Sequence, residues 1–286
     1  MYPTLVELGD ITLRSYPVMI LLAVITTIGL GPWWAARLEG LDPRRSFQAL
    51  LWIGLGVFAT ARAHFVLTHL DLFSSRPLRA IAFWSGGIHA GGAIVGMVLF
   101  GPLVLRRFQI PVARFADGFA PALGIGIAVA RLGCFLQGCC FGKVCRWPWG
   151  IHFPADTYIH QFHSQQGLLP PGATETAPIH PLQLYFAGAG LLLTVAALWV
   201  HRRKRYDGQV GLITLLLYSA GSAVLEPFRA DYHPRVYWGP LPQLEWVALA
   251  LTAGSLAALA IAEWRHRHDR ASQGREGSAE AGSSLR

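Results

Sequence analysis

Charged residues are scarce in this chain of 286 residues. They make up 14% of the sequence, whereas a soluble globular domain carries about 25%. Hydrophobic residues make up 53%. The net charge of +8 comes without a basic stripe interleaved with aromatic residues, so it does not indicate nucleic-acid binding. This composition argues against an ordinary soluble domain and predicts a protein that crosses a membrane several times.

Three further absences narrow the class of protein. The chain has only four cysteines, all between positions 134 and 145, so no disulfide framework runs through the whole chain. Residues 1–10 lack the positive charge of a secretory signal peptide, which predicts that the first apolar segment is an uncleaved helix. No internal repeat is evident, and this argues against an inverted-repeat transporter.

Seven apolar stretches are long enough to be considered as membrane helices, which need about 20 mostly apolar residues. They cover residues 16–36, 47–69, 88–105, 116–137, 182–200, 209–226 and 242–262. The predicted fold class is therefore an all-α membrane protein with seven transmembrane helices.

The distribution of Lys and Arg predicts the orientation of these helices. Fifteen of the 24 Lys and Arg residues lie on one side and seven on the other, so we expect a periplasmic N-terminus and a cytoplasmic C-terminus. The longest connection, about 138–181, joins the fourth and fifth helices on the outer side and is predicted to form a small periplasmic cap. Residues 1–266 would then be one transmembrane domain, and 267–286 a disordered cytoplasmic tail rich in Ser, Gly, Glu and Arg.

Polar residues inside apolar segments are functional candidates in a membrane protein. They are Arg62, His64, His89, Arg131, Gln183, Tyr185, Tyr218, Ser222 and Glu226, with Arg229 close behind. An unpaired buried charge such as Arg131 costs several kcal/mol, so it needs a partner or an anionic ligand. A guanidinium group binds two oxygens of one phosphate at the same time. The phosphate present at this depth is a phospholipid headgroup. Alternatively, Glu226 pairs with Arg229 or Arg131 and only ties helices together.

The cysteines leave three alternatives open. Cys134 and Cys139 are five positions apart, as are Cys140 and Cys145, with glycines that break the helix between them. A structural disulfide suits an oxidising periplasm, although the adjacent Cys139 and Cys140 cannot easily bond to each other. A metal site is possible without the usual Cys-x-x-Cys spacing. Reactive thiols are the third alternative.

Seven short motifs, six near the first six predicted helices and one in the cap, follow one another in a recognisable order. They are Leu13–Met19, Ala61–Leu67, Trp84–Gly92, Arg131–Gly142, Trp149–Pro154, His180–Tyr185 and Tyr218–Asp231. Arg131–Gly142 matches the frame Arg-x-Gly-Asn-Phe-x-Asn-Gly-Glu-x-x-Gly, and His180–Tyr185 reads His-Pro-x-Gln-Leu-Tyr. Together they resemble the prolipoprotein diacylglyceryl transferase family from the first helix to the last.

The resemblance implies seven helices with a periplasmic cap in the bacterial inner membrane. It also implies transfer of a diacylglyceryl group from phosphatidylglycerol to the lipobox cysteine of a prolipoprotein, which forms a thioether in the first step of lipoprotein maturation. The implied partners are this anionic phospholipid, the prolipoprotein signal peptide and the bilayer, without nucleic acid. No metal or cofactor is implied.

Such a reaction needs cations on the leaving phosphate and a base for the thiol. The matching catalytic candidates are His89, Arg131, Tyr218 and Glu226. The matching phospholipid-binding candidates are Tyr16, Arg62, Arg131, Gln183 and Arg229. Arg131 would hold the phosphate with help from Arg62 and Arg229, Glu226 would hold the arginines, and His89 or Tyr218 would act near the thiol.

The chain departs from the family pattern at several polar positions. Cys134 stands where the family has asparagine, Cys139 where it has glutamate, and Ser222 where it has a second arginine; Ala90 directly precedes the glycine pair that follows a family histidine. These changes motivate a second hypothesis. In it, the chain is a non-catalytic or repurposed member that binds phospholipid or uses its periplasmic thiols.

Overall fold

The computed structural model describes the chain in seven stretches, which divide into two compact units. The described residues are 4–8, 11–74, 77–82, 87, 90–155, 157–230 and 237–283. One unit spans Ile28–Phe119, and the other combines Met1–Thr27 with Ala120–Arg286. Each unit is described by itself.

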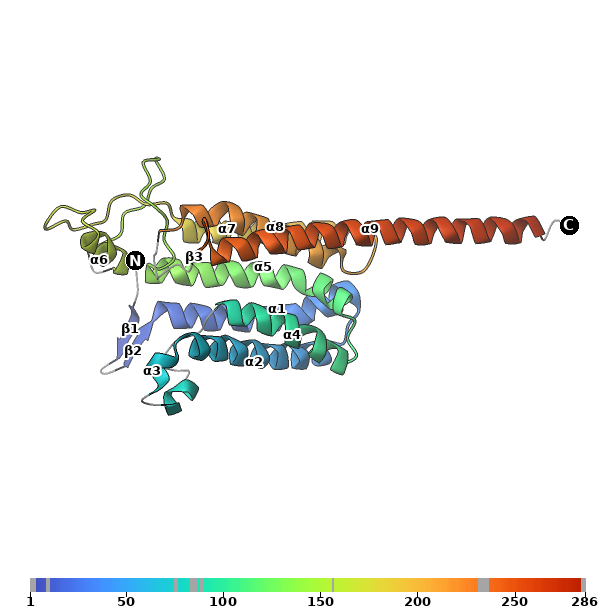
Figure 1. Ribbon diagram of the computed structural model, residues 1–286, viewed down its shortest axis with the longest axis horizontal. Coiled ribbons are helices and arrows are strands. Elements are labelled where there is room, and N and C mark those ends of the chain that lie inside the picture. Colours follow the sequence, from blue (N-terminus) through green and yellow to red (C-terminus); the bar gives the residue numbers. More distant parts are fainter. Residues whose placement is uncertain are drawn as a thin grey trace. The chain divides into compact units, whose positions relative to one another are not determined.

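The unit of residues 28–119 is built on a pair of packed helices, α2 and α4 (Figure 1). Its elements are the second half of α1 (Ser15–Glu39), α2 (Pro43–Thr68), α3 (Leu70–Ser74), the short helix η1 (Pro77–Ile81), α4 (Ala90–Arg107) and the start of α5 (Val112–Gln137). Helix α2 begins after Asp42, whose carboxylate accepts hydrogen bonds from the N–H groups of Arg44 and Arg45. This is an ordinary N-cap, and the proline at the first helical position suits it.

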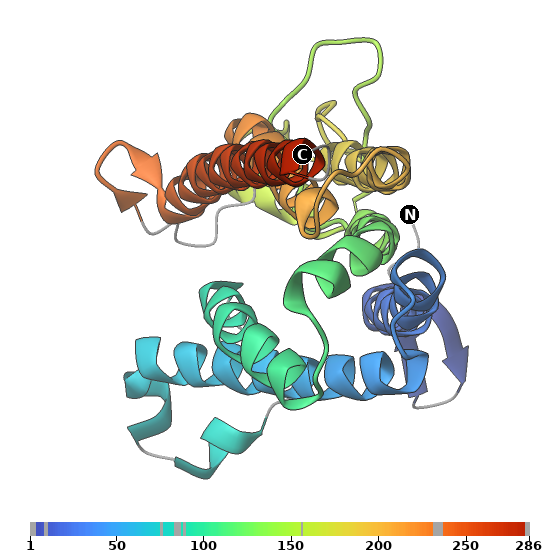
Figure 2. The same ribbon diagram turned by 90° about the vertical axis from the view of Figure 1, so that its right-hand side faces the viewer.

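The second unit holds the remaining helices and two small hairpins. Its further elements are β1 (Thr4–Leu8), β2 (Ile11–Arg14), α6 (Tyr158–Gln165), α7 (Leu182–His201), α8 (Gln209–Leu225), η3 (Glu226–Phe228), β3 (Tyr237–Trp238), β4 (Leu241–Pro242) and α9 (Gln243–Ser283). Helix α8 packs against both α7 and α9, and Figure 2 shows these three together in yellow to red. Among the described residues, the named strands pair as β1 with β2 and β3 with β4, and the sequence did not predict these hairpins.

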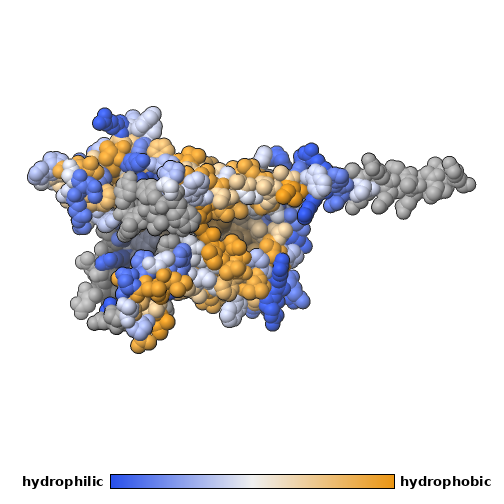
Figure 3. Space-filling view, in the orientation of Figure 1, coloured by the Kyte–Doolittle hydropathy of each residue, from blue (hydrophilic) through white to orange (hydrophobic). Residues whose placement is uncertain are grey.

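A helix is present at each of the seven predicted positions. Six of the described helices are long and apolar enough to cross a membrane, namely α1, α2, α5, α7, α8 and α9. Apolar side chains gather on the surface over the helices (Figure 3), and on α7 the side chains of Leu191, Leu192 and Val195 are each more than half exposed. Apolar surface of this extent fits contact with lipid rather than water. The prediction of a mainly helical, multi-pass membrane protein is confirmed.

Residues 138–181 contribute most of a buried hydrophobic core, to which Ala230 and Phe135 also belong. Phe141, Phe153, Ile159 and Ile179 are fully buried together. Isolated bridges connect this segment to itself, for example between Ile151 and Ile179, so the segment is folded and is not a plain linker.

Helix α9 continues to Ser283. That residues 267–286 form a disordered cytoplasmic tail stays a prediction. Near the start of that stretch the guanidinium of Arg267 is 3.0 Å from the Glu263 carboxylate, an i,i+4 pair of the kind that supports an exposed helix.

Small residues set the closest approach of α5 and α7. A Cβ added to Gly190 would lie 2.6 Å from the carbonyl oxygen of Gly124 and 3.0 Å from the nitrogen of Ala128. Beside them, the hydroxyl of Thr194 donates to the carbonyl of Pro121 at 3.0 Å. Such small-residue crossings are typical of membrane helices, because they let the backbones touch.

We expect Gly190→Leu to destabilise the protein and Gly188→Leu on the same helix to leave its stability unchanged. The first side chain meets backbone atoms, an overpacking that costs about 1–3 kcal/mol, whereas a Cβ on Gly188 has nothing within 4 Å. The apparent melting temperature of the two variants in detergent tests this directly. Equal melting temperatures would contradict the proposed crossing.

Candidate functional site

The site begins where α5 ends, because the last turn of that helix closes in a specific C-cap. The N–H groups of Gly138 and Cys139 both donate to the carbonyl of Cys134, at 3.0 and 3.1 Å, and Gly138 also donates to Phe135. This is the Schellman arrangement, which needs a left-handed residue that glycine adopts without strain. Gly138 has φ +75°. The cap turns the chain back so that Cys139 lies beside Cys134.

The loop after this cap is held between two other segments of the same unit. On one side the N–H of Lys143 donates to Phe228, and that of Ala230 donates to Phe141, which brings Arg229 alongside. On the other side the N–H of Gly142 donates to the carbonyl of His180 at 3.2 Å. A Cβ on Gly142 would lie 2.6 Å from His180, so this approach also needs glycine. The start of α7 and the end of α8 therefore meet at the cysteine loop.

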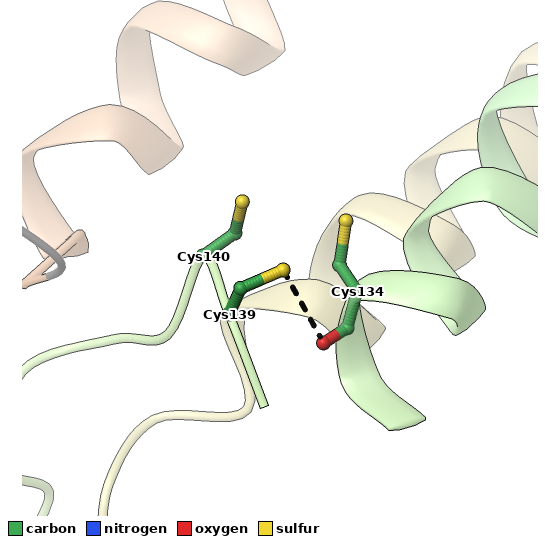
Figure 4. Close-up of side chains that lie close together, drawn as sticks. All are labelled: Cys134, Cys139 and Cys140. Carbon is green, nitrogen blue, oxygen red and sulfur yellow. Dashed lines mark hydrogen bonds between the residues drawn. The ribbon is translucent and has the colours of Figure 1, made fainter. Parts of the chain in front are cut away.

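Three thiols converge at this point. The sulfur atoms of Cys134, Cys139 and Cys140 all lie within 4.8 Å of one another (Figure 4). The Nη2 of Arg229 donates to the Cys140 sulfur at 3.5 Å. All four cysteines are thiols, and the fourth, Cys145, is buried outside this group. We call Cys134, Cys139 and Cys140 the thiol cluster; its sulfurs are the set that could hold a metal ion.

The surroundings of Cys140 favour its thiolate. The neighbouring thiols of Cys134 and Cys139, and then the guanidinium groups of Arg229 and Arg131, hold the pKa of Cys140 well below its usual range, although burial acts in the opposite direction. The pKa of Cys139 is raised, first by its hydrogen bonds to the other two thiols and then by burial. These surroundings therefore favour a thiolate at Cys140, beside a positive charge, over one at Cys139.

Arg131 lies on an aromatic ring. Its guanidinium carbon is 4.3 Å from the centroid of the Phe186 ring. Within the part of the chain that the structure describes, no carboxylate pairs with it; the carboxylate of Glu226 instead lies 3.6 Å from Nη1 of Arg229. Helix α8 ends at Leu225, and Glu226 and Arg229 face each other across the short η3 turn that contains Pro227. One carboxylate thus accompanies Arg229, and Arg131 retains its capacity for an anion.

The other site candidates of this unit surround the same region. The side chain of Tyr16 is within electrostatic reach of Arg131 and all three thiols. The amide of Gln183 is fully buried and donates to the carbonyl of Cys139 at 2.8 Å, so in the structure it supports the loop. Tyr218 and Ser222 line an apolar cavity of about 210 Å³ between α5, α7 and α8, and the Phe186 ring forms part of its wall.

Two further candidates, Arg62 and His89, belong to the unit of residues 28–119. Arg62 is buried, and its guanidinium donates to the backbone carbonyls of Arg79, Ala80, Ala82 and Gly87 at 2.7 to 3.4 Å. The rings of Phe65 and Phe73 lie 5.7 and 5.5 Å from it. His89 lies outside the described residues.

This arrangement places the guanidinium groups of Arg131 and Arg229 in the same region as an apolar cavity. Guanidinium groups and N–H donors bind an oxyanion, and the adjoining cavity suits hydrocarbon. Sequence reasoning identified Arg131, Arg229 and Glu226, but it did not identify Phe186 as the partner of Arg131 or Cys140 as the partner of Arg229.

We expect Cys140 to react with iodoacetamide at nearly the same rate at pH 6 and pH 8 in protein treated with a chelator. A thiol whose pKa is lowered is already ionised at pH 6, whereas an ordinary thiol with a pKa of about 8.5 gains roughly tenfold in thiolate per pH unit below that value. In Arg229→Gln the pKa of Cys140 should rise, because the variant removes one of the two guanidinium groups that lower it. Mass spectrometry of the labelled peptides measures each cysteine separately. A tenfold rise per pH unit in the native protein would contradict the assignment.

Comparison with known proteins identifies the family of this chain. The family model described as prolipoprotein diacylglyceryl transferase matches residues 3–273. A phosphatidylglycerol–prolipoprotein diacylglyceryl transferase of Synechococcus elongatus is 32% identical over 80% of this chain and 77% of its own length. Proteins of the same name from Nostoc sp. and Cupriavidus necator are each 30% identical, over 90% and 93% of this chain and 88% and 93% of their own lengths. The chain belongs to the prolipoprotein diacylglyceryl transferase family.

Proposed function

We propose that this protein transfers a diacylglyceryl group from phosphatidylglycerol to the lipobox cysteine of a prolipoprotein. The observation that carries the proposal is Arg131, a membrane arginine that lies on the Phe186 ring beside an apolar cavity of about 210 Å³. Family membership supports the same reaction. A phospholipid has a phosphate for the arginine and acyl chains for the cavity, so one molecule satisfies both parts of the site.

The chemistry assigns distinct roles to the groups at this site. The lipobox sulfur attacks the glyceryl carbon that carries the phosphate, a C–S bond forms, and the C–O bond to the phosphate breaks. Glycerol phosphate leaves with that electron pair, and the thiol proton passes to a base, the role predicted for His89 or Tyr218. Arg131 stabilises the charge that develops on the leaving phosphate. Arg229 is the second cation, and Glu226 holds its guanidinium.

Gln183 fits a positioning role better than a headgroup contact. Its buried amide donates to the Cys139 carbonyl, and the same loop carries Cys140 beside Arg229. Through this hydrogen bond Gln183 holds the loop that places Cys140 beside Arg229.

We also propose a membrane topology of seven crossings in the bacterial inner membrane. Helix α4 would be the seventh crossing, because it spans 18 residues and exposes the side chains of Val98, Leu99 and Leu103 by 59–65%. The excess of Lys and Arg at one set of helix ends supports a cytoplasmic C-terminus. Residues 138–181 then form the periplasmic cap.

We expect purified protein in vesicles with phosphatidylglycerol to add a diacylglyceryl mass to a lipobox peptide. Arg131→Gln should lower the rate by about 100-fold or more, the loss typical of removing a donor to a developing oxyanion. The matched control is Arg146→Gln, because Arg146 is an exposed arginine of the cap. Mass spectrometry of the peptide gives the rate, and equal rates for the two variants would contradict the role of Arg131.

We expect Arg62→Lys to lower the free energy of unfolding by about 2–4 kcal/mol, because an ammonium cannot reach the four backbone carbonyls that the guanidinium binds. The control is Arg107→Lys, an exposed arginine of the same unit. Melting temperature and transferase rate are measured together. A variant that loses activity at an unchanged melting temperature would instead support Arg62 as a phosphate ligand.

A second candidate function follows from the thiol cluster, two of whose members, Cys134 and Cys139, stand at polar positions of the family motif. In that case the chain binds phospholipid without transferring it. Co-purified phosphatidylglycerol with no modified peptide, and no rescue of a strain that lacks its transferase, would favour this candidate.

A further inference from the structure

The thiol cluster has a geometry that the transfer reaction does not use. Its three sulfurs come from the last turn of α5 and from the loop immediately after it, and they face a common space (Figure 4). The Schellman cap at Gly138 fixes the two backbones relative to each other, so the convergence does not depend on flexible side chains alone. The proposed transfer assigns no role to these three thiols in binding the phosphate or the glycerol group.

We propose that Cys134, Cys139 and Cys140 form a three-sulfur site for a soft metal ion, with copper(I) as the best-matched ion. Thiolates select soft ions such as copper(I) and zinc. Metal–sulfur bonds of about 2.3 Å place the three sulfurs of a trigonal site about 4 Å apart. The sulfurs here lie within 4.8 Å of one another, so rotations that move each sulfur by less than about 1 Å complete the site.

Charge balance supports a monovalent ion. Three thiolates and one copper(I) carry a net charge of −2, and Arg229 and Arg131 supply two positive charges to Cys140. The Nη2 of Arg229 already donates to the Cys140 sulfur at 3.5 Å, and this is the outer contact that orients a ligand and neutralises its charge. Divalent zinc would leave an excess of positive charge. Among the described residues, no fourth Cys, His, Asp or Glu joins the group, and three ligands suit copper(I) better than tetrahedral zinc.

The arrangement of the cysteines also distinguishes this site from a disulfide. Cys139 and Cys140 are neighbours in the chain, and a disulfide between them is strained. Cys140, the thiol beside Arg229, has φ +56°, a left-handed conformation that is uncommon for cysteine and costs about 1 kcal/mol or more. A disulfide between Cys134 and Cys139 would not need that conformation at Cys140, whereas a three-sulfur site does, because it directs the third sulfur toward the other two.

The test uses the full-length protein in detergent, reduced and freed of metal under anaerobic conditions. Copper(I) is titrated in the presence of bicinchoninate, a coloured copper(I) chelator, and no lipid or peptide substrate is added, so the outcome is separate from that of the transferase assay. We expect the protein to withdraw one equivalent of copper from the chelator. X-ray absorption should then show three sulfur neighbours at about 2.3 Å.

The variants provide matched controls. Cys139→Ser and Cys140→Ser should each weaken copper binding by at least about 100-fold, since even changes outside the ligand shell cost about 10–100-fold. Cys145→Ser, which removes a buried thiol outside the cluster, should bind as the native protein does. Gel filtration tests whether each variant is folded. The X-ray absorption measurement is made on the native protein and so does not depend on the folding of a variant.

Three results would overturn the proposal. The first is no stoichiometric copper uptake by the reduced native protein. The second is uptake that survives Cys139→Ser and Cys140→Ser or is lost equally in Cys145→Ser. The third is a copper spectrum dominated by nitrogen or oxygen neighbours.

Discussion

A guanidinium on an aromatic ring is the interaction around which this site is organised. Arg131 lies 4.3 Å from the centre of the Phe186 ring, and among the described residues no carboxylate neutralises it. A cation–π contact contributes about 0.5–2 kcal/mol, which is less than the several kcal/mol needed to remove a charge from water. The remaining cost explains why this position suits an anionic ligand, and a phospholipid brings one to the membrane boundary without leaving the bilayer.

The rest of the site depends on how one loop is held. Hydrogen bonds tie residues 141–143 to Phe228, Ala230 and His180, so a single short segment fixes the start of α7 and the turn after α8. The loop therefore sets the positions of Gln183, Arg229 and Glu226 together. A change in this loop would therefore move Arg229 through the backbone hydrogen bonds. The loop also carries Cys140, whose sulfur accepts a hydrogen bond from Arg229, a residue that is proposed to bind phosphate. Occupancy of the thiol cluster and phosphate binding would share Arg229.

The elements were predictable because apolar length is a strong signal. All seven stretches contain helices, and α7 begins at Leu182 as predicted. The site was predictable only in part. The sequence identified Arg131 and the Glu226–Arg229 pair from their depth and spacing, but contacts such as Arg131 with Phe186 join residues 55 positions apart in different helices, which periodicity does not encode.

The arrangement of the cysteines was also predictable only in part. Their spacing around Gly138 indicated a break in the helix, and the break is the Schellman cap. The spacing did not predict that Cys140 groups with Cys134 and Cys139, as it does in the structure. This grouping arises because the left-handed conformations of Gly138 and Cys140 reverse the chain within three residues.

The most direct measurement is a structure of the protein in nanodiscs that contain phosphatidylglycerol, determined by electron cryomicroscopy. We expect a lipid phosphate within hydrogen-bonding distance of the Arg131 guanidinium, with an acyl chain in the cavity lined by Tyr218 and Ser222. A headgroup bound elsewhere, with Arg131 still on Phe186 and no anion beside it, would contradict the central claim that this arginine is held in place for a phospholipid phosphate.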